Sequence, residues 1–172
     1  PSRERAVLSA DMALFLGRAN DAITLLEPLS RQGAGDPMAS ALLARALLVA
    51  GRIQDAGVLL QAAQAQYPND REIVLALGDV ARLQGDADAA LRWFTQATVA
   101  YPQSHEAWFG LGRVQTEKEN VGAATGALDQ AISLAPQAPG YHGERATLLA
   151  LTGSTSAARA AFDDALQRQP DD

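Results

Sequence analysis

The sequence predicts an all-α fold built from repeated pairs of helices, and three observations lead to this prediction. The 172-residue chain repeats itself every 34 residues without an insertion. Aromatic residues make up only 5% of the chain although 48% is hydrophobic, which favours closely packed helices with small side chains over a sheet. Strict alternation of apolar and polar residues, the pattern of a half-buried strand, is rare.

Five repeats account for nearly the whole chain, and we number positions within each from its first residue. Position 20 is alanine in every repeat, and position 8 is always alanine or glycine. Position 24 is always leucine or phenylalanine: Leu26, Leu60, Phe94, Leu128 and Phe162. We expect a single array of repeats at 3–36, 37–70, 71–104, 105–138 and 139–172, with residues 1–2 as a leader.

The repeated positions have the spacing of helix faces. Positions 4, 7, 8 and 11 share one face of a first helix, the A helix, and positions 20, 24 and 27 share one face of a second, the B helix. Small residues at positions 8 and 20 let the two helices approach, and the large residue at position 24 fills the space beside them.

Turn residues separate the helices. Glycine at position 15 in four repeats (Gly17, Gly51, Gly85 and Gly153) permits the turn from A to B, whereas the fourth repeat has Glu119 there. Proline at position 32 in four repeats ends the B helix. Start signals such as Asn69-Asp70 and Ser104 precede the next A helix.

Residues 108–136 carry the most specific motif. Trp108 is followed by Leu111-Gly112, then by Ala124, Leu128 and Pro136, and this order resembles the tetratricopeptide repeat (TPR). The resemblance implies a right-handed α-solenoid of five helix–turn–helix repeats that acts as a scaffold for another protein. The first repeat departs most from the pattern, and the fifth has His142 in place of the tryptophan.

The same resemblance implies a binding face. In TPR proteins the A helices line a concave groove, and positions 2, 5, 9, 12 and 13 face a bound peptide. The residues that we expect to bind a partner are Asp11, Met38, Arg45, Leu75, Asp79, Arg82, Glu106, Phe109 and Arg113. The groove lacks the residues with which TPR co-chaperones clamp a terminal carboxylate.

Two of these assignments have a structural alternative. The position-9 charges Asp11, Arg45, Asp79 and Arg113 could pair with one another between neighbouring A helices, at about 0–1 kcal/mol per exposed pair. Phe109 could fold over the gap left by Gly143 in the next repeat and pack inside the array. As an exposed aromatic residue it would instead anchor a partner side chain.

We find no pattern that indicates catalysis, a cofactor or a metal. The chain lacks cysteine, and its two histidines, His105 and His142, do not stand in a metal-binding motif. Gly110-x-Gly112 lacks the third glycine and preceding strand of a nucleotide loop, so we interpret it as helix packing. We expect a protein that is not an enzyme.

Charge and hydropathy bear on the partner. Twenty acidic residues face fourteen basic ones, giving a net charge of −6 that argues against nucleic acid. The longest apolar stretch, residues 41–50, is interrupted by Arg45 and too short to span a bilayer, so we expect no membrane insertion.

The expected partner is therefore a protein or peptide, and two other functions stay open. The chain could be a structural spacer or self-association module of a larger bacterial envelope protein, pairing end to end through the last B helix with Ala161, Ala165 and Leu166. It could also be an accessory domain of an exporter or regulatory assembly. We expect a fragment of a longer array with uncapped terminal repeats. The absence of cysteine favours the cell envelope (periplasm) over the cytoplasm.

Overall fold

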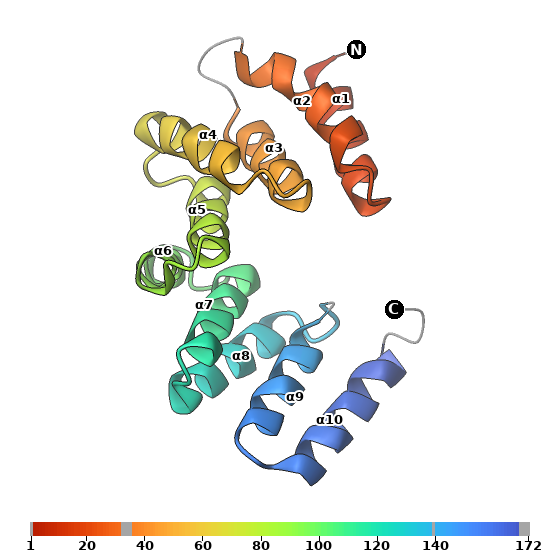
Figure 1. Ribbon diagram of the computed structural model, residues 1–172, viewed down its shortest axis with the longest axis vertical. Coiled ribbons are helices and arrows are strands. Elements are labelled where there is room, and N and C mark those ends of the chain that lie inside the picture. Colours follow the sequence, from red (N-terminus) through yellow and green to blue (C-terminus); the bar gives the residue numbers. More distant parts are fainter. Residues whose placement is uncertain (1, 32–35, 139, 169–172) are drawn as a thin grey trace. The chain divides into compact units, whose positions relative to one another are not determined.

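The computed structural model describes residues 2–31, 36–138 and 140–168, and these residues form ten α-helices and no strand (Figure 1). The A helices are α1 (Arg3–Phe15), α3 (Pro37–Val49), α5 (Arg71–Leu83), α7 (His105–Glu117) and α9 (Tyr141–Leu151). The B helices are α2 (Ala19–Arg31), α4 (Ile53–Gln66), α6 (Ala87–Ala100), α8 (Val121–Leu134) and α10 (Thr155–Arg168). Four A helices begin at the first residue of a predicted repeat; the fifth predicted start, Pro139, lies outside the described residues.

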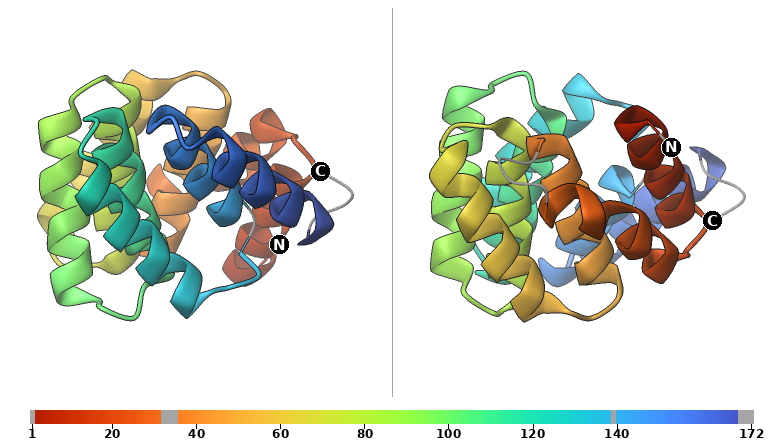
Figure 2. Two further views of the ribbon diagram at one scale, coloured as in Figure 1. Left: turned by 90° about the horizontal axis from the view of Figure 1, so that it is seen from below. Right: turned by 90° about the horizontal axis from the view of Figure 1, so that it is seen from above.

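The chain divides into two compact units, residues 1–86 and 87–172. The division falls between α5 and α6, the two helices of the third predicted repeat. In unit 1 each helix packs against the next, and α3 also contacts both α1 and α5. In unit 2 each helix likewise packs against the next, and α7 contacts α9. Figure 2 shows the helices of each unit stacked side by side.

The residues that recur at positions 8, 20 and 24 lie in the core, together with A-helix residues such as Ile73, Val74 and Leu77. The position-20 alanines of the first four repeats have no exposed surface, and that of the fifth, Ala158, is 3% exposed. At position 24, Leu26, Leu60 and Leu128 are fully buried and Phe94 nearly so. Phe162 is the exception. We predicted it in the core, but 40% of its surface is exposed because α10 packs against α9 alone among the described helices.

Two glycines bring α7 close to the B helices on either side of it. A Cβ atom on Gly110 would lie 2.2 Å from Cε1 of Phe94 in α6. A Cβ atom on Gly112 would lie 2.7 Å from Cγ of Leu128 in α8. Neither distance leaves room for a methyl group. The interpretation of Gly110-x-Gly112 as helix packing is confirmed.

The turns from A to B helices share one geometry. The glycines at position 15 have φ between 70° and 79°, in the left-handed region. After α3, for example, the Gly51 N–H donates to the Leu48 carbonyl and the Arg52 N–H to the Leu47 carbonyl, which is the Schellman arrangement. Glu119 takes the same conformation in the fourth repeat, with φ 57°.

His142 replaces the tryptophan of the repeat pattern without loss of its polar contact. Trp108 Nε1 donates to the carbonyl of Pro102, six residues earlier, at 2.9 Å. His142 Nε2 lies 2.9 Å from the carbonyl of Pro136, also six residues earlier. Each ring therefore ties the start of its A helix to the proline that closes the preceding B helix.

We predict that Gly110→Ala destabilises the protein. The added methyl would clash with the buried Phe94 ring, and overpacking of a core typically costs about 1–3 kcal/mol. We expect this cost to exceed the gain of about 1 kcal/mol from the better helix propensity of alanine. Urea unfolding measures the difference. Gly126→Ala in α8 is the control, because a Cβ there meets nothing within 4 Å; it should stabilise the protein, and equal effects of both changes would contradict the packing argument.

We also predict that Glu119→Gly stabilises the protein by up to about 1 kcal/mol. A left-handed backbone costs a residue with a Cβ atom about 1–2 kcal/mol, which exceeds the entropic cost of introducing glycine. The reciprocal change, Gly85→Ala at the equivalent turn, should lower the melting temperature. A lower melting temperature for Glu119→Gly would show that the glutamate side chain contributes more than the strain costs.

Candidate partner-binding face of the A helices

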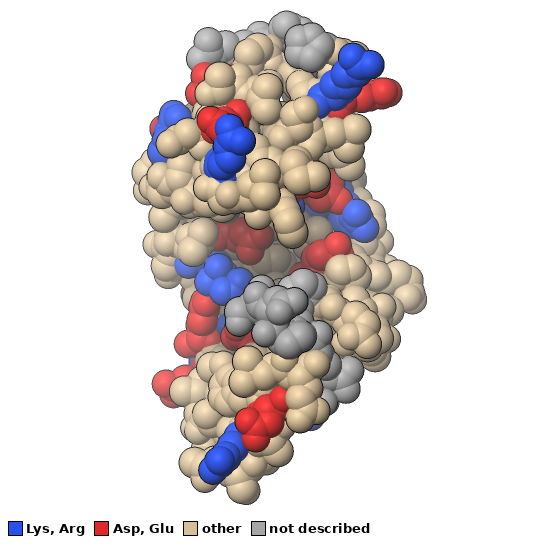
Figure 3. All heavy atoms as spheres, turned by 90° about the vertical axis from the view of Figure 1, so that its right-hand side faces the viewer, with Lys and Arg blue, Asp and Glu red and all other residues tan. Residues whose placement is uncertain are grey.

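Positive and negative side chains are mixed on the molecular surface. On the face drawn in Figure 3, Lys or Arg residues lie beside Asp or Glu residues, and most of the face carries neither. Among the described residues, no three His, Asp or Glu side chains are grouped so that they could hold a metal ion. No helix in this part of the chain has the length and apolar character to cross a membrane.

Asp11 and Arg45, both at position 9, form an ion pair between α1 and α3. Arg45 Nη2 lies 2.5 Å from Asp11 Oδ1, and the two side chains are 58% and 62% exposed. This pair matches the structural alternative in which position-9 charges bind one another. Because a guanidinium has five N–H donors, Arg45 retains donors for a partner's carbonyl groups.

The other predicted residues of unit 1 are reachable from solvent to different degrees. Met38, in the first turn of α3, is 55% exposed. Leu75, Asp79 and Arg82 lie along α5 and are half-buried. The structure therefore distributes these predicted residues over α1, α3 and α5, which contact one another in that order.

An apolar row at position 13 was not predicted from the sequence. Phe15, Val49 and Leu83 end helices α1, α3 and α5, and they are 87%, 61% and 43% exposed. Position 13 is among those that face a peptide in TPR proteins, so reading that position along the repeats would have found them. We call these three residues the apolar row.

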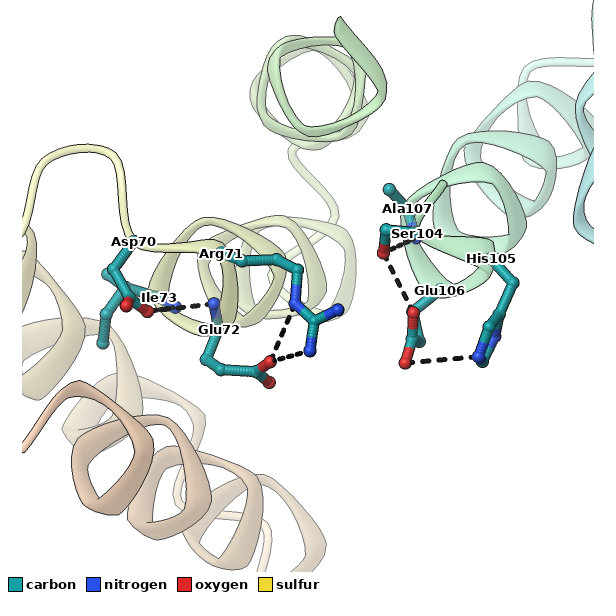
Figure 4. Close-up of polar contacts among 8 residues, drawn as sticks. All are labelled: Asp70, Arg71, Glu72, Ile73, Ser104, His105, Glu106 and Ala107. Carbon is teal, nitrogen blue, oxygen red and sulfur yellow. Dashed lines mark hydrogen bonds and ion pairs between the residues drawn. The ribbon is translucent and has the colours of Figure 1, made fainter. Parts of the chain in front are cut away.

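Helix caps fix the first turns of α5 and α7 (Figure 4). The Asp70 carboxylate accepts hydrogen bonds from the N–H groups of Glu72 and Ile73, and the Ser104 hydroxyl accepts one from the Ala107 N–H. The start signals predicted at both residues are confirmed. The Ser104 hydroxyl also donates to Glu106 at 2.9 Å, which orients this predicted binding residue.

Phe109 packs inside unit 2. Its ring stacks on that of Tyr141 in α9, with centroids 4.2 Å apart and an interplanar angle of 23°. Phe109 also packs against a buried cluster of Ala124, Leu128 and Leu148. The packing partner is therefore Tyr141 and not the gap at Gly143, where a Cβ atom would meet nothing within 4 Å. Phe109 is half-buried, whereas the residues of the apolar row are exposed.

Arg113 lies over the ring of Phe109. Its guanidinium carbon lies 5.6 Å from the centre of the Phe109 ring, within the range of a cation–π contact. Its Nε is 3.8 Å from a carboxylate oxygen of Glu144 in α9. Arg113 thus pairs with a position-6 residue of the next repeat, and the sequence pattern alone gave no indication of this partner.

A polar chain joins α7 to α9 beside the stack. His105 Nδ1 lies 2.7 Å from the Tyr141 hydroxyl, and His105 Nε2 lies 3.5 Å from Glu106. Burial raises the pKa of Tyr141 to about 12, and the negative charge of Glu106 acts in the same direction. Three predicted residues of unit 2, namely Glu106, Phe109 and Arg113, therefore gather around Tyr141, which the sequence analysis did not single out.

We predict that the protein loses stability as pH rises above 10. The raised pKa of Tyr141 means that the folded state disfavours its phenolate, so the stabilisation is complete below the unfolded pKa of about 10 and is lost between about 10 and 12. Urea unfolding at pH 8.5 to 11.5 would measure this slope. Tyr141→Phe should flatten it, while Tyr101→Phe is the matched control. Parallel slopes for the parent and Tyr141→Phe would contradict the assignment.

Known proteins share this architecture. Models of the tetratricopeptide repeat match residues 13–83, 75–139 and 116–172. Among curated proteins, none matches the sequence. The crystal structure of TTC0263, a thermophilic TPR protein of Thermus thermophilus, is 23% identical, with a TM-score of 0.88 over 98% of this chain and 92% of that one.

Two further structures are similar over most of this chain. MamA from Desulfovibrio magneticus is 19% identical, with a TM-score of 0.72 over 97% of this chain and 94% of that one. A chain of the APC/C hetero-tetramer Cut9–Hcn1 is 21% identical, with a TM-score of 0.83 over 95% of this chain but 33% of that one. At these identities the likeness shows the fold alone. The helix pairs and the family matches along both units show that this all-α solenoid belongs to the tetratricopeptide repeat family, whose fold in general supports protein–protein interaction.

Proposed function

We propose that this chain is a scaffold that binds a peptide or protein segment along the exposed face of its A helices. The observation that carries the proposal is the contrast between buried and open positions of the repeat. Positions 8 and 20 are buried throughout, whereas Asp11, Met38 and Arg45 on the A helices of unit 1 are more than half exposed. The predicted residues of α5 and α7 extend the set of side chains available within each unit.

Mixed charge on this face suits selection among partners. Arg45 can donate to backbone carbonyls of a bound segment, and Asp11 can accept from its N–H groups or attract a basic side chain. Complementary charges of this kind contribute more to specificity and association rate than to affinity. A partner should therefore carry an acidic and a basic group placed to meet this pair.

The test exchanges the two charges and keeps the pair. An Asp11→Arg, Arg45→Asp variant retains an exposed ion pair, so its stability should stay within about 1 kcal/mol of the parent. We expect a partner that crosslinks to the parent in cell extract, identified by mass spectrometry, to bind this variant at least about tenfold more weakly. Arg52→Asp, Asp55→Arg is the matched control, because that pair, 2.7 Å apart, is exposed at the start of α4.

Two outcomes decide between function and structure for this pair. If the partner is lost from the position-9 variant alone, the A-helix face is the binding surface. Equal recovery by the parent and both variants would overturn the proposal for these residues.

Self-association is a second candidate, favoured by apolar side chains on α10. Phe162 and Leu166 are 40% and 60% exposed and lie one turn apart, while Ala161 and Ala165 beside them are half-buried. Such a face on the last B helix could pair with a second copy of the chain, as a spacer or assembly module of a larger envelope protein would require.

We predict that self-association, if this face drives it, depends on Phe162. Sedimentation of the parent should then give a mass that rises with concentration. Phe162→Gln should abolish the rise, and Val58→Gln, at an exposed valine of α4, should leave it intact. A constant monomer mass for the parent across the concentration range would remove this candidate.

A further inference from the structure

Unit 1 presents an uncovered line of apolar side chains that its own fold does not use. Phe15, Val49 and Leu83 stand at the same position of three successive A helices and are exposed. We propose that this apolar row docks the apolar stripe of an amphipathic α-helix from a partner protein. The inference rests on the proposed function of the A-helix face and names the class of partner that it takes.

The register of the helices makes the row continuous. The ion pair between Asp11 and Arg45 places position 9 of α1 beside position 9 of α3. Position 13 lies one helical turn further on the same face, so Phe15 and Val49 are neighbours across the two helices. Because α3 also packs against α5, the row continues to Leu83. The row therefore runs across the A helices rather than along one of them.

The spacing of the row favours a helical occupant. Packed helices lie about 8–10 Å apart, so the row offers one apolar side chain at roughly that interval. Side chains seven residues apart on an α-helix are separated by about 10.5 Å and share a face. On an extended strand, side chains on one face recur about every 6.6 Å, which does not match one contact per A helix. A helix also presents a stripe broad enough to cover the residues beside the row.

The surroundings of the row specify the charge of that helix. The residues that follow it on the three A helices, Leu16, Ala50 and Gln84, are uncharged. Arg82 is the one charged residue at positions 12 to 15 of these helices. An apolar stripe therefore meets no charged residue at these positions of α1 and α3, and an acidic side chain at the end that meets α5 would complement the positive charge of Arg82.

The row does not recur in unit 2, where Leu151 at the end of α9 is 67% exposed but has no apolar counterpart at the same position of α7. In unit 2 the equivalent residue of α7 is Glu117, and a carboxylate in that place would oppose the burial of an apolar stripe. Three side chains form a contact well below the roughly 1,200 Å² of a stable interface, so we expect a Kd in the micromolar range.

The test selects segments from a displayed library of random 20-residue peptides on the whole 172-residue chain. The retained peptides are then titrated against a row variant, Phe15→Gln, Val49→Gln, Leu83→Gln. Glutamine keeps the helix propensity and removes the apolar surface. The control is Val58→Gln, Val99→Gln, which changes valines that are 70% and 79% exposed on the B helices α4 and α6. Thermal melting checks that all variants fold.

We expect the retained peptides to carry apolar residues at helical intervals. They should bind the parent and the control with the same affinity, and the row variant at least about tenfold more weakly. Peptides with prolines three residues apart, peptides that bind the row variant equally well, or no retained peptide would overturn the inference. The Asp11→Arg, Arg45→Asp variant distinguishes this inference from the proposed function of the A-helix face. Peptides that are sensitive to this exchange but not to the row variant would leave the proposed function standing, and sensitivity to neither would remove both.

Discussion

The close approach of A and B helices is the constraint on which the structure depends. It requires a residue without a long side chain wherever two helices meet, and the first four position-20 alanines accordingly have no exposed surface. In unit 2 the constraint is strictest, since Gly110 faces the Phe94 ring and Gly112 faces Leu128 at distances that exclude a methyl group. Large apolar side chains, among them Leu60, Phe94 and Leu128, then fill the remaining space.

The position of a residue in the repeat, and not its apolar character alone, decides whether it is buried. Position 24 is buried in the first four repeats, whereas position 13 is exposed in α1, α3 and α5. Residues such as Phe15 and Val49 therefore stay outside although they are as apolar as Leu26 inside. Singly exposed apolar residues are common in folded proteins, but a row aligned by the repeat marks a surface that another chain can cover.

Much of this fold could be predicted from the sequence because each element has a local cause. The 34-residue spacing, the glycine turns and the caps at Asp70 and Ser104 place the helices without knowledge of tertiary contacts. What could not be predicted depends on contacts between repeats. The repeat pattern puts Phe109 on the right face of α7, yet only the packing of α9 shows that Tyr141 is its partner. Phe162 failed as a core residue for the same reason, since its position is buried only when a following helix covers it.

The two parts of the predicted binding face differ in what a partner would have to displace. On unit 2, Phe109 is already stacked, Arg113 lies over its ring near Glu144, and His105 holds the Tyr141 hydroxyl. A segment that inserted there would break these contacts before making its own, which lowers the net gain. On unit 1, Val49 and Phe15 are exposed and the pair of Asp11 and Arg45 is open to solvent. Binding at unit 1 requires only that water leave this surface, so the affinity of the scaffold should reside in its first three A helices.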